Sequence, residues 1–147
     1  IEATMPKALT YIENILSDGR PLLGGEEVSI ADCTLQSALQ FAHAAFASGH
    51  EITQVFFYQD GVTQASDAQV PLADEFDAPH AWSRFAQEYG VRLVVCVSAA
   101  ERRGVLDQEQ AIDAGKTVFN IHPDFHIEGL GVMHDASFTA DRTVTFK

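Results

Sequence analysis

The sequence predicts an α/β fold, in which a doubly wound parallel sheet carries helices on its faces. Two observations predict this class. Strand-like runs alternate with helical patterns from residue 50 onward, an order typical of parallel sheets. The run VRLVVCV, residues 91–97, is almost continuously apolar, as expected for a parallel strand covered on both faces. Sheets of this class carry their sites at the carboxyl ends of the strands.

The first fifty residues depart from this pattern, because they predict two helices and no opening strand. Apolar residues recur at helical spacing over 6–16, and residues 17–27 are typical of a connection. In the second helix, Ser29 can act as the N-cap with Asp32 three residues on, and Gly49 supplies the end. We therefore expect an atypical helical segment in place of the first strand.

The later elements are predicted from alternation, apolar periodicity and the glycines that end helices. In chain order they are a strand at 52–58, a polar loop at 59–77, a helix from Pro79 to Gly90, a strand at 91–97, a helix at 99–114 broken near Gly104 and closed by Gly115, a helix at 132–139, and a last strand at 142–146. Strands thus alternate with helices after the first fifty residues.

Cys96 is the leading candidate for a reactive residue. It lies at or near the end of the strand 91–97, and a helix begins directly after it. Helix N-terminal amides and the nearby cations Arg102 and Arg103 would favour a thiolate there. The alternative is a buried structural residue, because free cysteine is among the most buried residue types. Cys33 lies in an unrelated context, on the second predicted helix, and is expected to be unreactive.

A histidine-rich stretch offers a rival site. His122, His126 and His134 lie close in sequence, and HPDFH has a spacing seen between zinc ligands. Pro123 interrupts any helical register between the first two, and no cysteine lies nearby to complete the set. We therefore expect neither a metal nor an organic cofactor.

Two other motifs are weaker. The glycines of GLG, residues 129–131, could expose amides to an anion at a helix start, but the full phosphate-binding pattern is missing. The acidic cluster DEFD, residues 74–77, could supply paired carboxylates. A solvated loop that caps the next helix explains it more simply.

Composition excludes several classes of function. At 147 residues, 46% of them hydrophobic, the chain is long enough for one domain with a buried core. The net charge of −12 would repel phosphate backbones, which argues against direct nucleic-acid binding. No apolar run approaches the roughly 18 residues of a membrane span, and no secretory signal is apparent. Two unrelated cysteines suit a reducing cytoplasm.

Residues 40–147 resemble the DsrE/TusD family of sulfur-relay subunits. The resemblance is carried by QFAHAAFASGHEITQVFFYQDGV, LVVCVSAAERRGVLD, NIHPDFHIEGLG and ADRTVTF, in that order. It implies a flavodoxin-like fold, assembly with two related small subunits into a hexamer, and a persulfide on Cys96. It also implies sulfur transfer to a downstream acceptor protein, toward 2-thiolation of the tRNA wobble uridine or, in other members, sulfur oxidation. The alternative is a non-catalytic assembly subunit with a structural cysteine.

Residues 1–42 resemble the helical C-terminal region of glutathione transferases, through KALTYIENIL and RPLLGGEEVSIADCTLQSALQFA. Two resemblances in one chain predict a chimera. The glutathione-binding domain is absent, so glutathione transfer is not implied. The family's opening strand, which would lie inside the sheet, is also absent. Because a gap inside a sheet leaves backbone groups unpaired, we expect the chain to self-associate or to join partner subunits.

Overall fold

The computed structural model describes residues 35–73 and 75–146. It divides the chain into two compact units. The first holds residues 1–52, 73–76 and 146–147, and the second holds residues 53–72 and 77–145. The predicted helix at 6–16, the cap at Ser29 and Cys33 lie outside the described residues.

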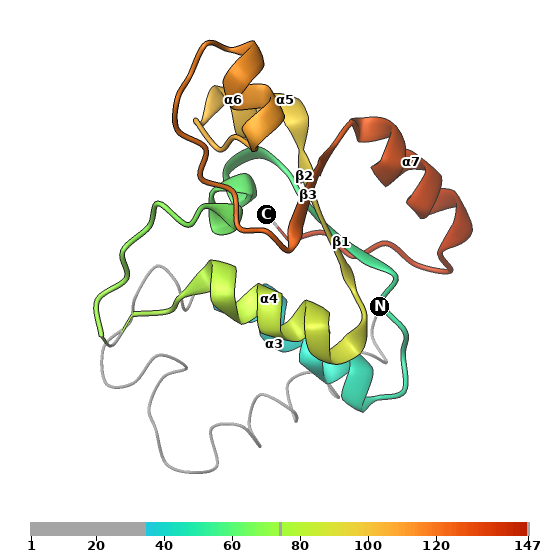
Figure 1. Cartoon of the computed structure of the whole chain (residues 1–147). Helices are drawn as coiled ribbons and strands as arrows, with labels where there is room; N and C mark the ends of the chain where they lie inside the picture. Colours follow the sequence, from blue (N-terminus) through green and yellow to red (C-terminus); the bar gives the residue numbers. More distant parts are fainter. Residues whose placement is uncertain (1–34, 74, 147) are drawn as a thin grey trace. The chain divides into compact units, whose positions relative to one another are not determined.

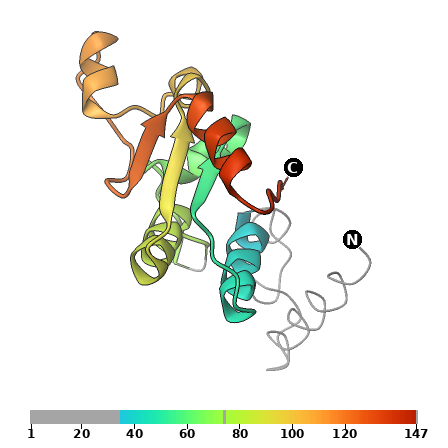
Figure 2. The same ribbon diagram turned by 90° about the vertical axis from the view of Figure 1, so that its right-hand side faces the viewer.

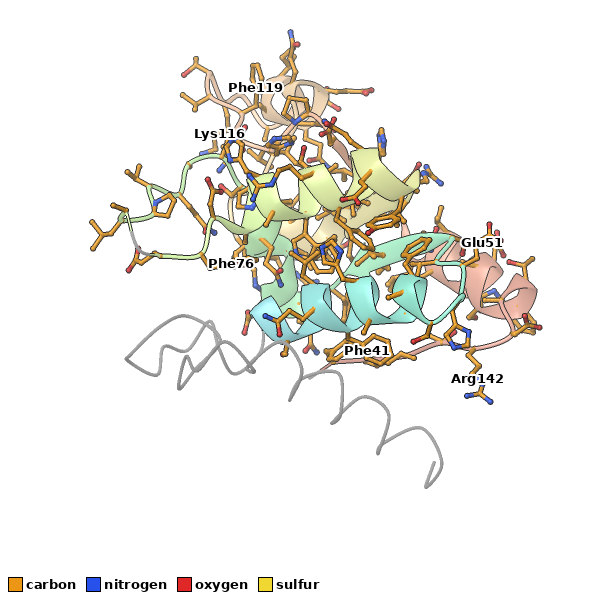
Figure 3. All side chains as sticks on the ribbon, turned by 90° about the horizontal axis from the view of Figure 1, so that it is seen from below. Phe41, Glu51, Phe76, Lys116, Phe119 and Arg142 are labelled. Carbon is orange, nitrogen blue, oxygen red and sulfur yellow. The ribbon has the colours of Figure 1, made fainter. Side chains whose placement is uncertain are left out.

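The described part of the first unit is dominated by helix α3, Leu35–Ala47. Gly49 ends it as predicted, with a φ of +81° that L-residues with side chains rarely adopt. The amide of Gly49 donates to the carbonyl of Phe46 at 2.9 Å, and that of His50 donates to Ala45 at 3.0 Å. Phe41, labelled in Figure 3, packs edge-on against Phe146. The ring centroids of the two residues are 5.4 Å apart.

The second unit is built on a three-stranded sheet of order β1-β2-β3. Its strands are β1 (Gln54–Phe57), β2 (Arg92–Cys96) and β3 (Phe125–Glu128). Both pairings are parallel, with Val55 opposite Leu93, and Leu93 opposite Phe125. The predicted parallel α/β sheet is therefore confirmed, with the apolar run 91–97 as its central strand (Figure 1).

Five helical segments accompany these strands in the second unit. They are the 3₁₀ helix η2 (Gln59–Ala65) and the α-helices α4 (Ala78–Tyr89), α5 (Val97–Arg102), α6 (Gln108–Asp113) and α7 (Leu130–Thr139). Helices α4 and α7 lie on opposite sides of the sheet (Figure 2). No helix among the described residues is both long and apolar enough to traverse a bilayer.

Aromatic side chains fill the core between α4 and the sheet. Phe57 of β1 contacts Trp82 and Phe125, with ring centroids 5.3 Å apart in both pairs. Trp82 also contacts Phe85 one turn along α4, and both rings are almost fully buried. The indole Nε1 of Trp82 donates to the side-chain oxygen of Gln64 at 2.7 Å. This bond satisfies two buried polar groups and fixes the end of η2 against α4.

The ends of α4 are those that the sequence predicts. Asp77, from the acidic cluster DEFD, is the N-cap and accepts from the amide of His80. Pro79 lies in the first turn, where its missing N–H costs nothing. Gly90 closes the helix in the left-handed region, with a φ of +70°.

The predicted break of the helical stretch 99–114 near Gly104 is confirmed, because the chain turns there with a φ of +71° and separates α5 from α6. Two expectations about the elements are wrong. The predicted strand 142–146 lies in no helix or strand, since β-propensity forms a strand only where a neighbour supplies hydrogen bonds. Strand β3 is not among the predicted elements, because its alternation of apolar and polar residues extends over only four residues, Phe125–Glu128.

The expected gap inside the sheet is also absent from the described strands. β1 is hydrogen-bonded directly to β2, and β2 to β3, so no vacant position separates them. Within the part of the chain that the structure describes, the free edges are the outer edges of β1 and β3. An inner strand would have to break a ladder that is already complete.

Asp124 ties the start of β3 to α4. The Ser83 hydroxyl and the Gln87 amide both donate to Asp124 Oδ2, the latter at 2.8 Å. The hydrogen bond from Ser83 is the main cause that lowers the pKa of Asp124 below its ordinary value. Burial opposes this effect, and Gln87, His122 and His126 add to it. The cluster therefore favours the carboxylate over the carboxylic acid.

Substitution Asp124→Asn should lower the free energy of unfolding at pH 7 by about 1 kcal/mol, the usual size for a hydrogen bond at a partly exposed site. Because the pKa of Asp124 is lower in the folded protein than its ordinary value, the carboxylate stabilises the fold at pH values above the ordinary carboxyl pKa. This stabilisation is lost as the pH falls through the lowered pKa. The difference in free energy of unfolding between Asp124→Asn and the parent protein should therefore have its full size at pH 5 and become smaller below about pH 4. Urea unfolding at several pH values measures it. Asp113→Asn, at an exposed carboxylate, is the control, and the same pH dependence in both variants would contradict the assignment.

Candidate functional site

Cys96 ends the central strand and begins the next helix. It is the last residue of β2, lies opposite Glu128 of β3, and occupies the N-cap position of α5. Cys96 thus lies at the strand end, as predicted, although β2 ends one residue before the predicted strand 91–97 and α5 begins at Val97 rather than at residue 99. Cys96 forms no disulfide, and only 2% of its surface is exposed. The thiol lies at the carboxyl ends of the parallel strands, where the sites of α/β proteins form.

Helix η2 packs against both elements that Cys96 joins. It follows β1 and contacts α5 and β2. Val62 and Ala65 of η2 are fully buried. On α5, Ala100 is fully buried and Ala99 is nearly so. Small side chains on α5 allow another backbone to approach closely. The sequence predicts a polar loop at 59–77 and not this packing, because a short 3₁₀ helix has no strong apolar period.

The two predicted supporting arginines differ in their surroundings. Arg103 Nε and Nη2 both donate to Asp60 Oδ1, at 2.8 and 2.6 Å, and Nη1 donates to the Ala99 carbonyl at 3.3 Å. Its side chain thus runs back along α5. Arg102 lies exposed in the last turn of α5, and its guanidinium makes no hydrogen bond or ion pair with the described residues. Their predicted support of the thiolate remains a prediction.

The partner of Arg103 could not be found from the sequence. Asp60 lies 43 residues earlier, in a segment without a motif. Only the packing of η2 on α5 brings the two side chains together.

The histidines are not gathered into one ligand set. His122 Nδ1 accepts from the amide of Asp124 at 3.2 Å, and its ring meets that of His80 with centroids 5.2 Å apart. His134 lies on α7, exposed and against Phe138. In residues 35–73 and 75–146, no three His, Cys, Asp or Glu side chains are arranged to hold a metal ion. The motif GLG lies at the start of α7, with Gly129 as its N-cap.

We expect no stoichiometric zinc, because a tetrahedral site needs about four converging ligands. Elemental analysis of the purified chain should find well below one zinc per molecule. His122→Ala is the matched variant and should leave the metal content unchanged. One zinc per chain that is lost in this variant would establish the rival metal site.

Comparison with known proteins assigns the family. The model of the DsrE/DsrF-like family matches residues 31–146, and the chain belongs to this family. A sulfurtransferase TusD from Salmonella newport is 46% identical over 110 residues, which are 75% of this chain and 86% of that protein. A DsrE protein from Allochromatium vinosum is likewise 46% identical over 110 residues, 75% of this chain and 85% of its own.

Similarity to the family extends before residue 40. The family model begins at residue 31. A sulfurtransferase TusD from Salmonella arizonae is 42% identical over 126 residues, 86% of this chain and 93% of that protein. Residues 40–147 alone cannot hold so long a match. Part of the segment 1–42 is therefore similar to DsrE-like proteins.

Proposed function

We propose that this chain is a sulfurtransferase subunit that carries a persulfide on Cys96. The observation that carries the proposal is a free thiol at the carboxyl end of the central strand, in a chain of the DsrE/DsrF-like family. The relatives named sulfurtransferase TusD support the activity. A reducing cytoplasm suits an unpaired thiol of this kind.

The reaction requires two exchange steps at one sulfur atom. The Cys96 thiolate attacks the outer sulfur of an incoming persulfide, and the donor's S–S bond breaks with its electron pair leaving on the donor thiolate. Cys96 then holds the group S–SH. An acceptor thiolate attacks the outer sulfur of this group, and Cys96 leaves as a thiolate. Each S–S bond formed replaces one that breaks, so no external oxidant or cofactor is needed.

Which pathway receives the sulfur is a more specific proposal than the sulfurtransferase activity itself. We favour transfer through an acceptor protein toward 2-thiolation of the tRNA wobble uridine, because several relatives carry the name TusD. The DsrE relative is equally similar, which keeps sulfur oxidation as the alternative. The net charge of −12 argues that any link to RNA runs through partner proteins.

One observation favours a second candidate, the non-catalytic assembly subunit. Cys96 is almost fully buried, as a structural cysteine would be. Reactivity of the thiol separates the two functions.

Incubation with a cysteine desulfurase and cysteine should add one sulfur to the chain, detected by intact-mass measurement. The added sulfur should disappear in Cys96→Ser and remain in Cys33→Ser, because Cys96 ends the central strand of the sheet, whereas the sequence predicts Cys33 within a helix. Sulfur retained in Cys96→Ser would end the carrier assignment. A parent protein that takes up no sulfur would favour the assembly subunit.

The proposal includes association with related small subunits, as the family resemblance implies. Helix α7 supports it, because none of its side chains is buried and Leu130, Met133 and Phe138 are exposed. The resemblance of residues 1–42 to glutathione transferases, and the chimera it implies, stay predictions, because residues 1–34 lie outside the described part.

Sedimentation at several protein concentrations should detect species larger than a monomer, because exposed apolar side chains favour association. Met133→Glu, which places a charge on α7, should shift the population toward the monomer. A monomer at every concentration, with cooperative thermal unfolding, would contradict self-association.

A further inference from the structure

We propose that the ion pair between Arg92 and Glu128 sets the charge that an incoming sulfur donor or acceptor meets at Cys96. Glu128 alone would repel an anionic sulfur, and Arg92 cancels that repulsion. This inference rests on the proposed persulfide function and deepens it by naming two specificity-determining residues that no sequence motif contains.

The register of the sheet places Glu128 beside Cys96. Cys96, the last residue of β2, pairs with Glu128, the last residue of β3. The two strands lie side by side in Figure 2. Paired residues of neighbouring strands point to the same face, and their backbones lie about 4.8 Å apart. The Glu128 side chain therefore begins next to the thiol.

Arg92 shares this face of the sheet with Cys96. Phe57 pairs with Val95, and its ring contacts Trp82, so this face of β2 lies against α4. Side chains alternate between the two faces along a strand. Because Arg92 and Cys96 lie three residues before and one residue after Val95, both point to the opposite face, away from α4.

Arg92 neutralises the Glu128 carboxylate. Its Nη2 donates to Glu128 Oε1 at 2.6 Å, and the side chains of Arg92 and Glu128 are 46% and 36% exposed. Arg92 lies four residues before Cys96, so its side chain runs along the face toward the end of the strand. Charges in partly solvated positions act over about 8 Å at physiological ionic strength. The intact pair therefore presents nearly no net charge to the sulfur.

The chemistry of sulfur exchange makes this balance matter. Both exchange steps bring a second sulfur to Cys96 while negative charge passes between the sulfurs in line. A carboxylate without a partner disfavours further negative charge in its vicinity. The chain as a whole has 21 acidic residues against nine lysines and arginines, and its net charge of −12 repels anions. Arg92 is one of these few cations, and it is paired with the carboxylate opposite the thiol.

The test compares the rates at which iodoacetate and iodoacetamide alkylate Cys96 in the full chain, in a Cys33→Ser background that leaves one thiol. Both reagents attack the same thiolate and need the same access, so the ratio of their rates cancels changes in exposure. Iodoacetate alone carries a negative charge. The ratio of iodoacetate to iodoacetamide rates therefore reports the charge around the sulfur.

The two single variants should change this ratio in opposite directions. Arg92→Gln leaves the carboxylate uncompensated and should lower the ratio about three- to tenfold, as Coulomb's law gives for one charge several ångströms away in a partly solvated site. Glu128→Gln leaves the guanidinium and should raise the ratio by a similar factor. Arg92→Lys, which keeps the charge, and the double variant Arg92→Gln with Glu128→Gln should both stay near the parent value.

The matched controls make the same charge changes on α4, against the other face of the sheet. They are Arg84→Gln and Glu88→Gln, at exposed positions of that helix. Both should keep the parent ratio. A pair that only ties β2 to β3 would loosen the sheet in both single variants and would not move the ratio in opposite directions. A shift of the same sign in both, no shift in either, or equal shifts in the controls would overturn the inference.

Sulfur loading of the same proteins separates this inference from the proposed function. If the ratio shifts as expected, yet neither the parent nor any variant accepts sulfur from a cysteine desulfurase, the charge pair stands and the carrier function fails. If the parent accepts sulfur at Cys96 and both single variants keep the parent ratio, the function stands and the charge pair fails.

Discussion

The sheet depends on β2 being paired on both of its edges. β1 and β3 each bond to β2 and not to one another, so both ladders lose their partner if β2 is displaced. Leu93, Val94 and Val95 are at most 1% exposed, and their β-branched or bulky side chains fill both faces of the strand. Backbone groups of a strand so deeply buried must be bonded within the protein. The ladder therefore fixes the position of every residue in β2, including its last, Cys96.

A reactive sulfur at the end of such a strand meets two opposing demands. Burial shields a thiol or persulfide from oxidants in solution, since susceptibility follows exposure and thiolate character. Transfer demands that the same sulfur meet another protein. Strand β2 sets where the Cys96 sulfur lies, and its 2% exposure meets the first demand rather than the second.

The family relationship defines the chemistry more closely than the pathway. Relatives named TusD and DsrE share the same 46% identity with this chain. The printed names of these relatives agree on a sulfurtransferase and differ in the system to which it belongs. Identity of this size therefore supports the activity without separating the two pathways.

The sequence by itself determined the parallel α/β class, the limits of α4 and the location of Cys96 at a strand end, because these depend on signals within a few residues. The run 91–97, the cap at Asp77 and the glycines 49, 90 and 104 are such signals. Only the tertiary structure decided that β3 is a strand, that 142–146 is not, and that Asp60 reaches Arg103. Each of these depends on a partner tens of residues away. Pairing and burial between distant segments leave no local pattern, and they alone enclose the Cys96 thiol.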